Sequence, residues 1–323
     1  GGKLGFETAP VYGVSAGAVF YTTSAMDSSS GTVAKNDTTL FDRDTAGNRK
    51  NATYLGQAYV QAKLGNTLVK LGRQQLDTPL AGSDDARMLP TLFEAAVVIN
   101  SDIKDTTLIG AHVTRIAYGT FANGYPGGEL ALVSGYGDRA DYKVGVFQSM
   151  GQAALGDTAK NSGVTAAAAI YKGIPGLTVQ VWDYYAAEIL NAIYAQADYS
   201  WKCLLNPAAT MTGSVQYIKE SDMHDTLNLS SAPYYAVQLA TKAGSFNAAA
   251  AYSATGKNNS ASFGGNVITP WGGMPAFTQG MVTRHQFFKD TTAWKVSAGY
   301  NLKDILGQDI TASAYYASFK VNS

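Results

Sequence analysis

The chain has 323 residues, and its 24 basic and 24 acidic side chains give a formal net charge of zero. This balance argues against a general nucleic-acid binder, which needs a basic surface. The mean hydropathy is −0.07, and no run of about 18 apolar residues exists, which excludes a membrane-spanning helix. The single cysteine, Cys203, excludes an internal disulfide framework.

Segments of about ten residues, in which small or apolar side chains alternate with polar ones, recur along the whole chain. Successive side chains of a strand point to opposite faces, so each segment predicts a strand with one apolar and one polar face. The predicted strands, in chain order, are 2–8, 14–24, 52–64, 67–76, 94–102, 107–118, 129–136, 141–150, 163–172, 177–186, 191–201, 209–219, 233–243, 246–255, 291–301 and 309–319.

The segment from Asn191 to Trp201 shows the pattern most clearly. Its apolar face ends in the aromatic residues Tyr199 and Trp201, and its other face carries small polar residues and Asp198. An apolar face bordered by aromatics, opposite a lightly charged polar face, is typical of a transmembrane β-barrel with lipid outside and water inside. We therefore predict an all-β protein, an up-and-down antiparallel transmembrane barrel with about sixteen strands in this chain.

Short and long connections alternate between the predicted strands, apart from the brief loop 187–190. The short ones are 65–66, 104–105, 138–140, 173–176, 244–245 and 303–308, and the long ones are 25–51, 77–93, 119–128, 151–162, 220–232 and 256–290. Outer-membrane barrels have short periplasmic turns and long extracellular loops. The pattern predicts one barrel domain over 1–323 in the bacterial outer membrane, with 256–290 as a long extracellular loop.

Aromatic residues gather near the ends of the predicted strands. Such side chains favour the lipid headgroup zone, where one edge of the ring is apolar and the other is wet. Ordinary β-propensity would also enrich them in strands. We predict an aromatic girdle that includes Tyr54, Tyr199, Trp201, Trp294 and Tyr300.

The loop 77–94 is the best candidate for a constriction. It contains the charged residues Asp84, Asp85, Arg87 and Glu94, and an apolar run from Met88 to Phe93. An extracellular loop needs such a run only if it packs against the barrel wall. The alternative is a solvated loop with an apolar patch. We predict that the loop folds into the barrel, where its charges set size and selectivity. The predicted anchors are Met88, Leu89, Leu92 and Phe93.

Alternation also predicts which charged residues line the lumen. His112, Lys143, Asp198, Lys242 and Lys295 fall on predicted inward faces. Arg73 and Arg115 lie near the extracellular ends of their strands, where strict alternation places them on the outer face. Each is either an interfacial residue or turned inward by a bulge, and we slightly favour the lumen.

Neither an enzyme nor a cofactor protein is predicted. The chain contains no HExxH, CxxC, GxSxG or P-loop motif. The pair Asp84–Asp85 offers oxygen ligands that suit Ca²⁺, although such a pair is more often a polar loop element. We expect no other metal and no cofactor.

The stretch LGRQQLDTPLAGSDDARMLPTLFEAAVVINSDI, from Leu71 to Ile103, resembles the OprD-type outer-membrane porin family. It looks closest to the epsilonproteobacterial branch, which includes the major outer-membrane porins. Its fairly specific part runs from Arg87 to Pro90, and supporting segments are Gly1 to Thr23, Gly173 to Ala186 and Asn191 to Trp201.

The resemblance implies an eighteen-stranded barrel, of which this chain would lack one strand at each end. It also implies that 77–94 is the constriction loop, with Arg87 among its charges. Family members pass small water-soluble solutes, and some prefer amino acids or carboxylates through a row of basic residues. The basic candidates here are scattered. Porins commonly form homotrimers, but no residue fixes the oligomeric state.

Two functions from different classes remain at this stage. The first is a passive diffusion channel that conducts small hydrophilic solutes and ions across the bilayer. The second is a non-conducting surface barrel, an adhesin or interaction platform. The aromatic residues of loop 256–290 keep the second hypothesis open, because exposed aromatics often mark interaction sites. The loop would otherwise fold over its own barrel mouth. These residues are Phe263, Trp271, Phe277, Phe287 and Phe288.

Overall fold

The computed structural model of the chain describes residues 1–24, 42–43, 49–83, 88–120, 144–156, 162–223, 232–257, 265–273, 275–280 and 284–322. A single antiparallel sheet of 15 strands dominates the described residues. Its strands are β1 (Gly2–Glu7), β2 (Val14–Thr23), β5 (Ala52–Leu64), β6 (Thr67–Gln74), β7 (Leu92–Asn100), β8 (Thr106–Ala117), β9 (Gln148–Ser149), β10 (Val164–Tyr171), β11 (Leu177–Ala186), β12 (Leu190–Lys202), β13 (Ala209–Asp222), β14 (Tyr234–Ala243), β15 (Phe246–Thr255), β16 (Thr291–Asn301) and β17 (Thr311–Val321).

The remaining elements are short. Strands β3 (Asp42–Arg43) and β4 (Arg49–Lys50) form a separate ribbon. The helices are α2 (Met150–Leu155), α3 (Lys303–Leu306) and the 3-10 turn η4 (His285–Phe287). Among the described residues, no helix is long and apolar enough to cross a membrane.

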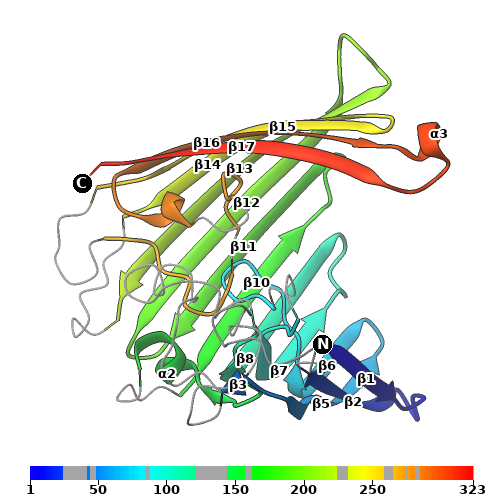
Figure 1. The fold of residues 1–323 in the computed structure, drawn as a ribbon, viewed down its shortest axis with the longest axis vertical. Helices are drawn as coiled ribbons and strands as arrows, with labels where there is room; N and C mark the ends of the chain where they lie inside the picture. The colour runs from blue at the N-terminus through cyan, green and yellow to red at the C-terminus, as the bar shows by residue number, and fades with distance from the viewer. Residues whose placement is uncertain are drawn as a thin grey trace.

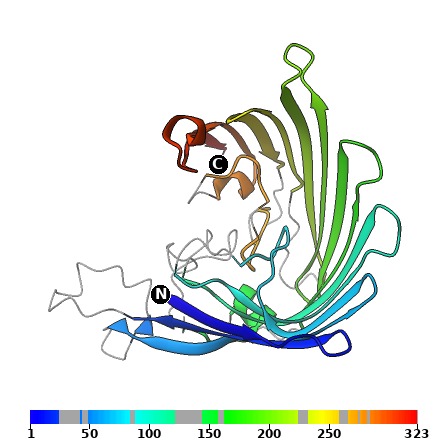
Figure 2. The ribbon, with the colours of Figure 1, turned by 90° about the vertical axis from the view of Figure 1, so that its right-hand side faces the viewer.

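Apart from the short β9, which pairs with β8 alone, consecutive strands of the sheet pair with one another, which confirms the predicted up-and-down antiparallel order. The sheet curves around an interior, and β1 and β17 are its two edges (Figure 2). No ladder joins β1 to β17 in the described part of the chain. Short turns lie at one end of the strands and long loops at the other (Figure 1). We call these the turn end and the loop end.

The other predicted strands are all present, and two, 129–136 and 141–150, need separate comment. The first lies outside the described residues, as do 141–143. β10 pairs directly with β8, so this region adds no complete hairpin between them. Ser149 and Gln152 instead form a capping box that starts α2 at Met150, and only Gln148–Ser149 pair with β8.

One face of the sheet is apolar and points away from the interior. On β14, Tyr235, Val237 and Leu239 are about half exposed, whereas Tyr234 and Ala236 between them are buried. The cross-strand partners Tyr252 and Val296 on neighbouring strands are also exposed. An outward face of this composition suits hydrocarbon and would be unfavourable in water.

Aromatic residues lie at both ends of this outer face. At the turn end, Tyr199 and Trp201 stack with ring centroids 5.9 Å apart, and at the loop end Trp294 and Tyr316 lie 5.2 Å apart. Small apolar residues occupy the strand between the two levels. The outward aromatics are Tyr171, Tyr199, Trp201, Phe246 and Tyr300 at the turn end, and Tyr185, Tyr217, Tyr235, Tyr252, Trp294 and Tyr316 at the loop end.

Tyr54 does not belong to this girdle, which corrects the prediction from alternation. A register shift between Val19 and Phe20 inserts an extra residue on β5, so the face of Tyr54 is reversed. Tyr54 instead stacks on Tyr21, which is 3% exposed, at a centroid distance of 5.9 Å.

Ala249 and Ala250 on β15 provide a matched test of the two faces. Ala250 faces outward between Leu239 and Val296, and Ala249 faces inward between Ala240 and Ser297. We expect Ala250→Lys to lower the free energy of unfolding in bilayers by about 2–4 kcal/mol, because the charge enters hydrocarbon. Ala249→Lys should cost much less. Denaturant unfolding from vesicles measures both, and equal costs would contradict the assignment of faces.

Candidate functional site

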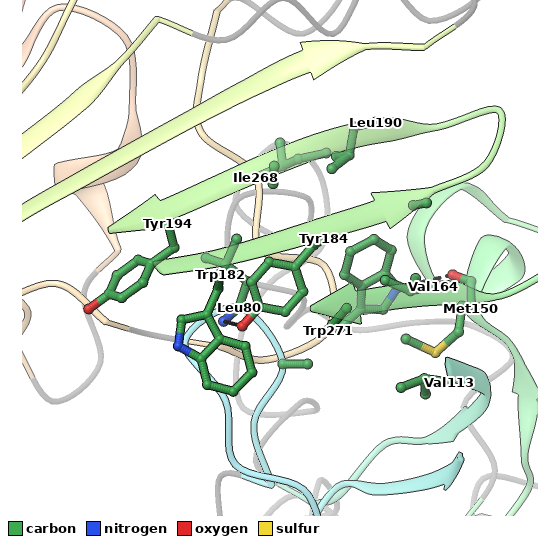
Figure 3. Packing of buried hydrophobic residues seen from close by; sticks show 14 of the residues in the cluster. Leu80, Val113, Met150, Val164, Trp182, Tyr184, Leu190, Tyr194, Ile268 and Trp271 are labelled. Atoms are coloured by element: carbon green, nitrogen blue, oxygen red, sulfur yellow. Dashed lines mark hydrogen bonds between the residues drawn. The ribbon is translucent and has the colours of Figure 1, made fainter. Parts of the chain in front are cut away.

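The chain leaves β6 and crosses the interior instead of passing over the rim. The amide of Leu80 donates to the Tyr184 hydroxyl on β11 at 3.3 Å, and Leu80 is 3% exposed. Strands β7, β8 and β10 separate β6 from β11 in the sheet, so this segment spans their inner faces. Figure 3 shows Leu80 between Trp182 and Tyr184.

Local hydrogen bonds give this segment its shape. Asp77 accepts from the backbone amide of Ser83 at 2.9 Å and from its hydroxyl at 2.6 Å. Thr78 donates its hydroxyl to the Ala81 carbonyl at 2.9 Å. Side-chain bonds to nearby backbone groups are typical of Asp and Thr in turns, and here they hold residues 77–83 as a compact unit.

A second loop meets the first inside the barrel. Gly82 donates its amide to the Trp271 carbonyl at 3.2 Å, and the Trp271 indole donates to the Met150 carbonyl at 3.1 Å. A Cβ on Gly273 would lie 2.2 Å from the Leu80 carbonyl carbon, so the two backbones approach closely only because residue 273 has no side chain. We call residues 77–83 and 265–273 together the loop pair.

Polar bonds fasten the second loop to the inner wall. Glu220 of β13 accepts from the Ile268 amide at 3.0 Å. Thr255 of β15 donates to the Gln286 carbonyl at 2.6 Å, and Lys295 of β16 donates to the Gln279 carbonyl at 2.8 Å. The described part of loop 256–290 therefore lies against the inner face of β13–β16 and reaches the middle of the interior.

The aromatic residues of this loop face the barrel. Trp271 is 2% exposed and Phe287 is fully buried against Tyr234, while Phe277 and Phe288 are partly buried in the same cluster. Phe263 lies outside the described residues. The hypothesis of an exposed aromatic interaction surface is therefore wrong for the described residues, because the barrel's own wall covers these rings.

The predicted charge cluster of the first loop, Asp84, Asp85 and Arg87, lies outside the described residues, and so does Lys143. Met88 and Leu89 belong to a second apolar cluster with Tyr21 and Val144. Leu92, Phe93 and Glu94 are the first residues of β7 and not part of the loop, because their backbones pair with β6 or β8. Leu92 and Phe93 are fully buried.

Three predicted charges lie side by side near the loop end. The Arg73 Nε and Glu94 Oε2 atoms are 3.5 Å apart, and both side chains are about one-third exposed. The Arg73 guanidinium also lies 4.4 Å from the Phe147 ring centroid. Arg115 is the partner of Glu94 in the β7–β8 register. Arg73 shares the face of Leu71, which is 50% exposed, and Glu94 stands between the buried Phe93 and Ala95, so these charges lie on the outer face near the loop end. The lumenal placement that we favoured for Arg73 and Arg115, and the one predicted for Glu94, are therefore wrong. A partly exposed ion pair of this kind contributes little to stability.

His112 does not face the lumen. It pairs with Thr165, its Nδ1 lies 3.0 Å from the Thr165 hydroxyl, and the imidazole is exposed. The neighbouring Val113 is 5% exposed and packs in the inner cluster, so the face of this strand is opposite to that predicted. The register between β7 and β8 shifts between Glu94 and Ala95, which pair with Arg115 and Val113. This bulge places Arg115 on the face opposite to that of Val113.

The inner wall of β12 and β13 carries a polar row. Gln196 donates to both carboxylate oxygens of Asp198, at 3.0 and 2.8 Å, and receives a bond from Gln216 at 2.9 Å. Lys242 lies on the same inner face, because its register partner Thr210 faces inward. Asp198, Lys242 and Lys295 thus stand on one side of the lumen.

Sequence reasoning missed a second polar cluster on the opposite wall. Glu7 accepts from Tyr59 and Gln61, each at 2.8 Å, and from Ser15 at 3.1 Å. The Lys70 amine lies 3.6 Å from the Tyr59 ring centroid. Alternation had placed Gln61 inward, but it did not identify Glu7, whose partners come from two other strands.

The lumen therefore has a polar wall and an apolar loop pair crossing it. The described residues contain no group of three or more potential metal ligands. Calcium at Asp84–Asp85 stays a prediction.

Comparisons with known proteins agree with this architecture. Residues 4–317 match the family model described as outer membrane porin, OprD family. The fold resembles *Pseudomonas aeruginosa* OccK9 (OpdG), with a TM-score of 0.72 and 17% identity over 98% of this chain and 75% of that one. No curated protein sequence matches the chain.

Two further solved structures have the same fold. *Pseudomonas aeruginosa* OccK8 (OprE) has a TM-score of 0.66 and 16% identity, over 95% of this chain and 73% of that one. *Pseudomonas aeruginosa* OpdK with vanillate has a TM-score of 0.68 and 13% identity, over 98% and 76%. At such identities the likeness concerns the fold.

Tyr184 and Tyr185 are adjacent and face opposite sides, which allows a matched test of the loop attachment. Tyr184→Phe removes the acceptor of the buried Leu80 amide. We expect protection of that amide against hydrogen exchange to fall by about 1–3 kcal/mol, the cost of an unpaired buried donor. Tyr185→Phe on the outer face should leave it unchanged. Unaltered exchange in both variants would show that the bond does not hold the loop.

Proposed function

Because the chain belongs to the OprD family of outer-membrane porins, we propose that it is a passive diffusion channel for small hydrophilic solutes and ions, narrowed by the loop 77–94. Proteins of this family are channels in the outer membrane and not enzymes, and their barrels are embedded in the lipid bilayer. The epsilonproteobacterial branch is part of this proposal, supported by the motif from Arg87 to Pro90.

The contact between Leu80 and Tyr184 carries the proposal. A loop that reaches four strands across the inner face removes cross-section from the lumen, as a constriction must. Its apolar residues pack on the wall, and its polar bonds within 77–83 preserve its shape. Rigid narrowing of this kind separates solutes by size without a conformational cycle.

Charges around the narrow region are proposed to set ion preference. Asp84, Asp85 and Arg87 belong to the loop, and Asp198, Lys242 and Lys295 stand on the wall. In a narrow passage with low-dielectric walls, such charges act over several ångströms and concentrate ions of opposite sign. Lys295 lies beside the second loop, because its amine donates to the Gln279 carbonyl at 2.8 Å.

A role as an adhesin or interaction platform gains no support from the described residues. The described aromatics of that loop pack against the inner wall, and Glu220, Thr255 and Lys295 bond to the loop. Single-channel recording separates the two functions. Stable ohmic steps in planar bilayers are expected, and their absence from protein verified as folded would refute the channel.

Trp271 and Trp294 are matched tryptophans on opposite faces of the barrel. Trp271→Ala removes the indole at the centre of the loop pair, so we expect a larger single-channel conductance. Trp294→Ala removes an outward ring, 45% exposed, and should leave conductance unchanged. Unchanged conductance in the first variant, with folding verified by electrophoretic mobility, would show that the loop pair does not limit the current.

Lys295 and Lys320 test the contribution of inward charge. We expect Lys295→Glu to move the reversal potential in a salt gradient toward cation selectivity, because it replaces a lumenal positive charge by a negative one. Lys320→Glu changes the net charge by the same amount, but its side chain lies on the outer face of β17. Its register partner, Thr292, shares that face with Trp294. The selectivity change should shrink at high ionic strength. Equal shifts in both variants would contradict a lumenal role of Lys295.

A further inference from the structure

The outer face of the barrel carries a cluster of charged side chains at the loop end of β6, β7 and β8. Arg73, Glu94 and Arg115 lie in one register row across these three strands, and His112 lies on the same face, closer to the turn end. A charge on this face is unfavourable in hydrocarbon and is tolerated near the interface. We call Arg73, Glu94, Arg115 and His112 the outer charged patch.

Both arginines of the patch keep hydrogen-bond donors that no described protein group uses. The Arg73 guanidinium contacts Glu94 through Nε and lies over the Phe147 ring, so its two terminal nitrogens have no partner in the described part of the chain. Arg115 is exposed, and its side chain makes no hydrogen bond or ion pair with any described residue. With one carboxylate between two guanidinium groups, the patch has an excess of positive charge and can bind a further anion.

The patch lies at the depth of the lipid headgroups. His112 and its partner Thr165 are in the same register row as Tyr185, one of the aromatic residues at the loop end of the outer face. Aromatic side chains of this kind lie at the headgroup level. Arg73 and Arg115 are closer to the loop end than this row, which is where lipid phosphates lie beyond the acyl chains.

Apolar side chains continue the same three strands toward the middle of the wall. Leu71 on β6, Val98 on β7 and Leu108 on β8 share the face of the patch, and all three are exposed. A ligand that fits this surface has an anionic head over the arginines and hydrocarbon along the strands. A phospholipid combines both.

We propose that the outer charged patch binds the phosphate group of a lipid in the membrane leaflet at the loop end. The guanidinium groups of Arg73 and Arg115 donate to the phosphate oxygens, which the planar fork of arginine matches well. The His112 imidazole, 3.0 Å from the Thr165 hydroxyl, is a further polar group beside the phosphate. A headgroup that is a phosphate monoester binds best, because it carries more negative charge than a diester.

A second copy of the chain is the competing occupant of this face, since an acidic residue of another barrel would also pair with the arginines. The exposed aliphatic residues next to the patch favour lipid, because they continue a wall that already faces hydrocarbon. The outward acid of β11, Asp183, is also engaged within its own chain, where it accepts a hydrogen bond from Asn191 at 2.6 Å. The proposal concerns the outer face and not conduction, so it stands or falls independently of the channel function.

Spin-labelled lipids test the proposal on the full chain. In a Cys203→Ser background, Val98→Cys carries a nitrobenzoxadiazole label beside the patch, and Val237→Cys carries it on the outer face of β14 as the control. The protein is refolded into phosphatidylcholine vesicles that contain nitroxide-labelled phosphatidic acid or nitroxide-labelled phosphatidylcholine. We expect the labelled phosphatidic acid to quench position 98 more strongly than the labelled phosphatidylcholine does, and the two lipids to quench position 237 equally.

Variants of the patch test which side chains are responsible. Arg73→Gln with Arg115→Gln should remove the preference for phosphatidic acid at position 98, and each single variant should lower the relative affinity by about fivefold at low ionic strength. Lys219→Gln with Lys320→Gln is the matched control, because it removes the same charge from the outer faces of β13 and β17 and should leave the preference intact.

Glu94→Gln provides a variant with the opposite expected effect. It removes the carboxylate that contacts Arg73 and repels phosphate, so the preference for phosphatidic acid at position 98 should increase. A gain in lipid binding does not result from loss of folding.

Two results would overturn the proposal. Equal quenching of position 98 by the two labelled lipids would eliminate phosphate recognition. Absence of lipid quenching at position 98, with normal quenching at position 237, would mean that another copy of the chain covers the patch. Quenching at position 237 establishes that the barrel is inserted whether or not it conducts, so either result concerns the patch alone.

Discussion

A strand inside a bilayer has no water to receive its N–H and C=O groups, so neighbouring strands must pair them. The long antiparallel ladder from β1 to β17 satisfies this requirement along the sheet. Pairing of consecutive strands then sets every other feature, because short turns collect at one end, long loops at the other, and side chains alternate between lipid and lumen. The outward row of alanine, valine and leucine between two aromatic levels follows from the same constraint.

The inner face of the barrel has a different requirement. A lumen that conducts solutes needs polar walls, but polar contacts alone do not hold the loops in place inside it. The loop pair has apolar contacts at its centre, around Leu80 and Trp271, and hydrogen bonds to the wall at Tyr184 and Glu220. The glycine at 273 permits the backbones to touch. The loops are thereby part of the folded core and not appendages of the rim.

The charged residues are distributed differently over the inner wall and the two ends of the barrel. On the wall, Asp198 and Glu7 are held by amides and hydroxyls from adjacent strands, which fixes their position in the water-filled region. At the loop end, Arg73 and Glu94 pair beside Arg115. At the turn end, Lys202 and Lys242 stand beside Thr210 on the inner face, and the Lys202 amine donates to the Thr210 hydroxyl at 3.3 Å.

The sequence by itself determined the strands, their order, the ends at which turns and loops lie, and the class of protein, because alternation and loop length depend only on neighbouring residues. For the same reason, alternation assigned Asp198 and Trp294 to the faces on which the register puts them. Alternation assigned Tyr54 and His112 to the wrong faces. A bulge reverses the face of Tyr54, and the neighbouring strands show that Val113, not His112, faces inward. Only the tertiary structure decided that Trp271 and Phe287 are buried, because their partners Met150 and Tyr234 are distant in sequence. Such contacts depend on the curvature of the whole sheet, which no local pattern encodes.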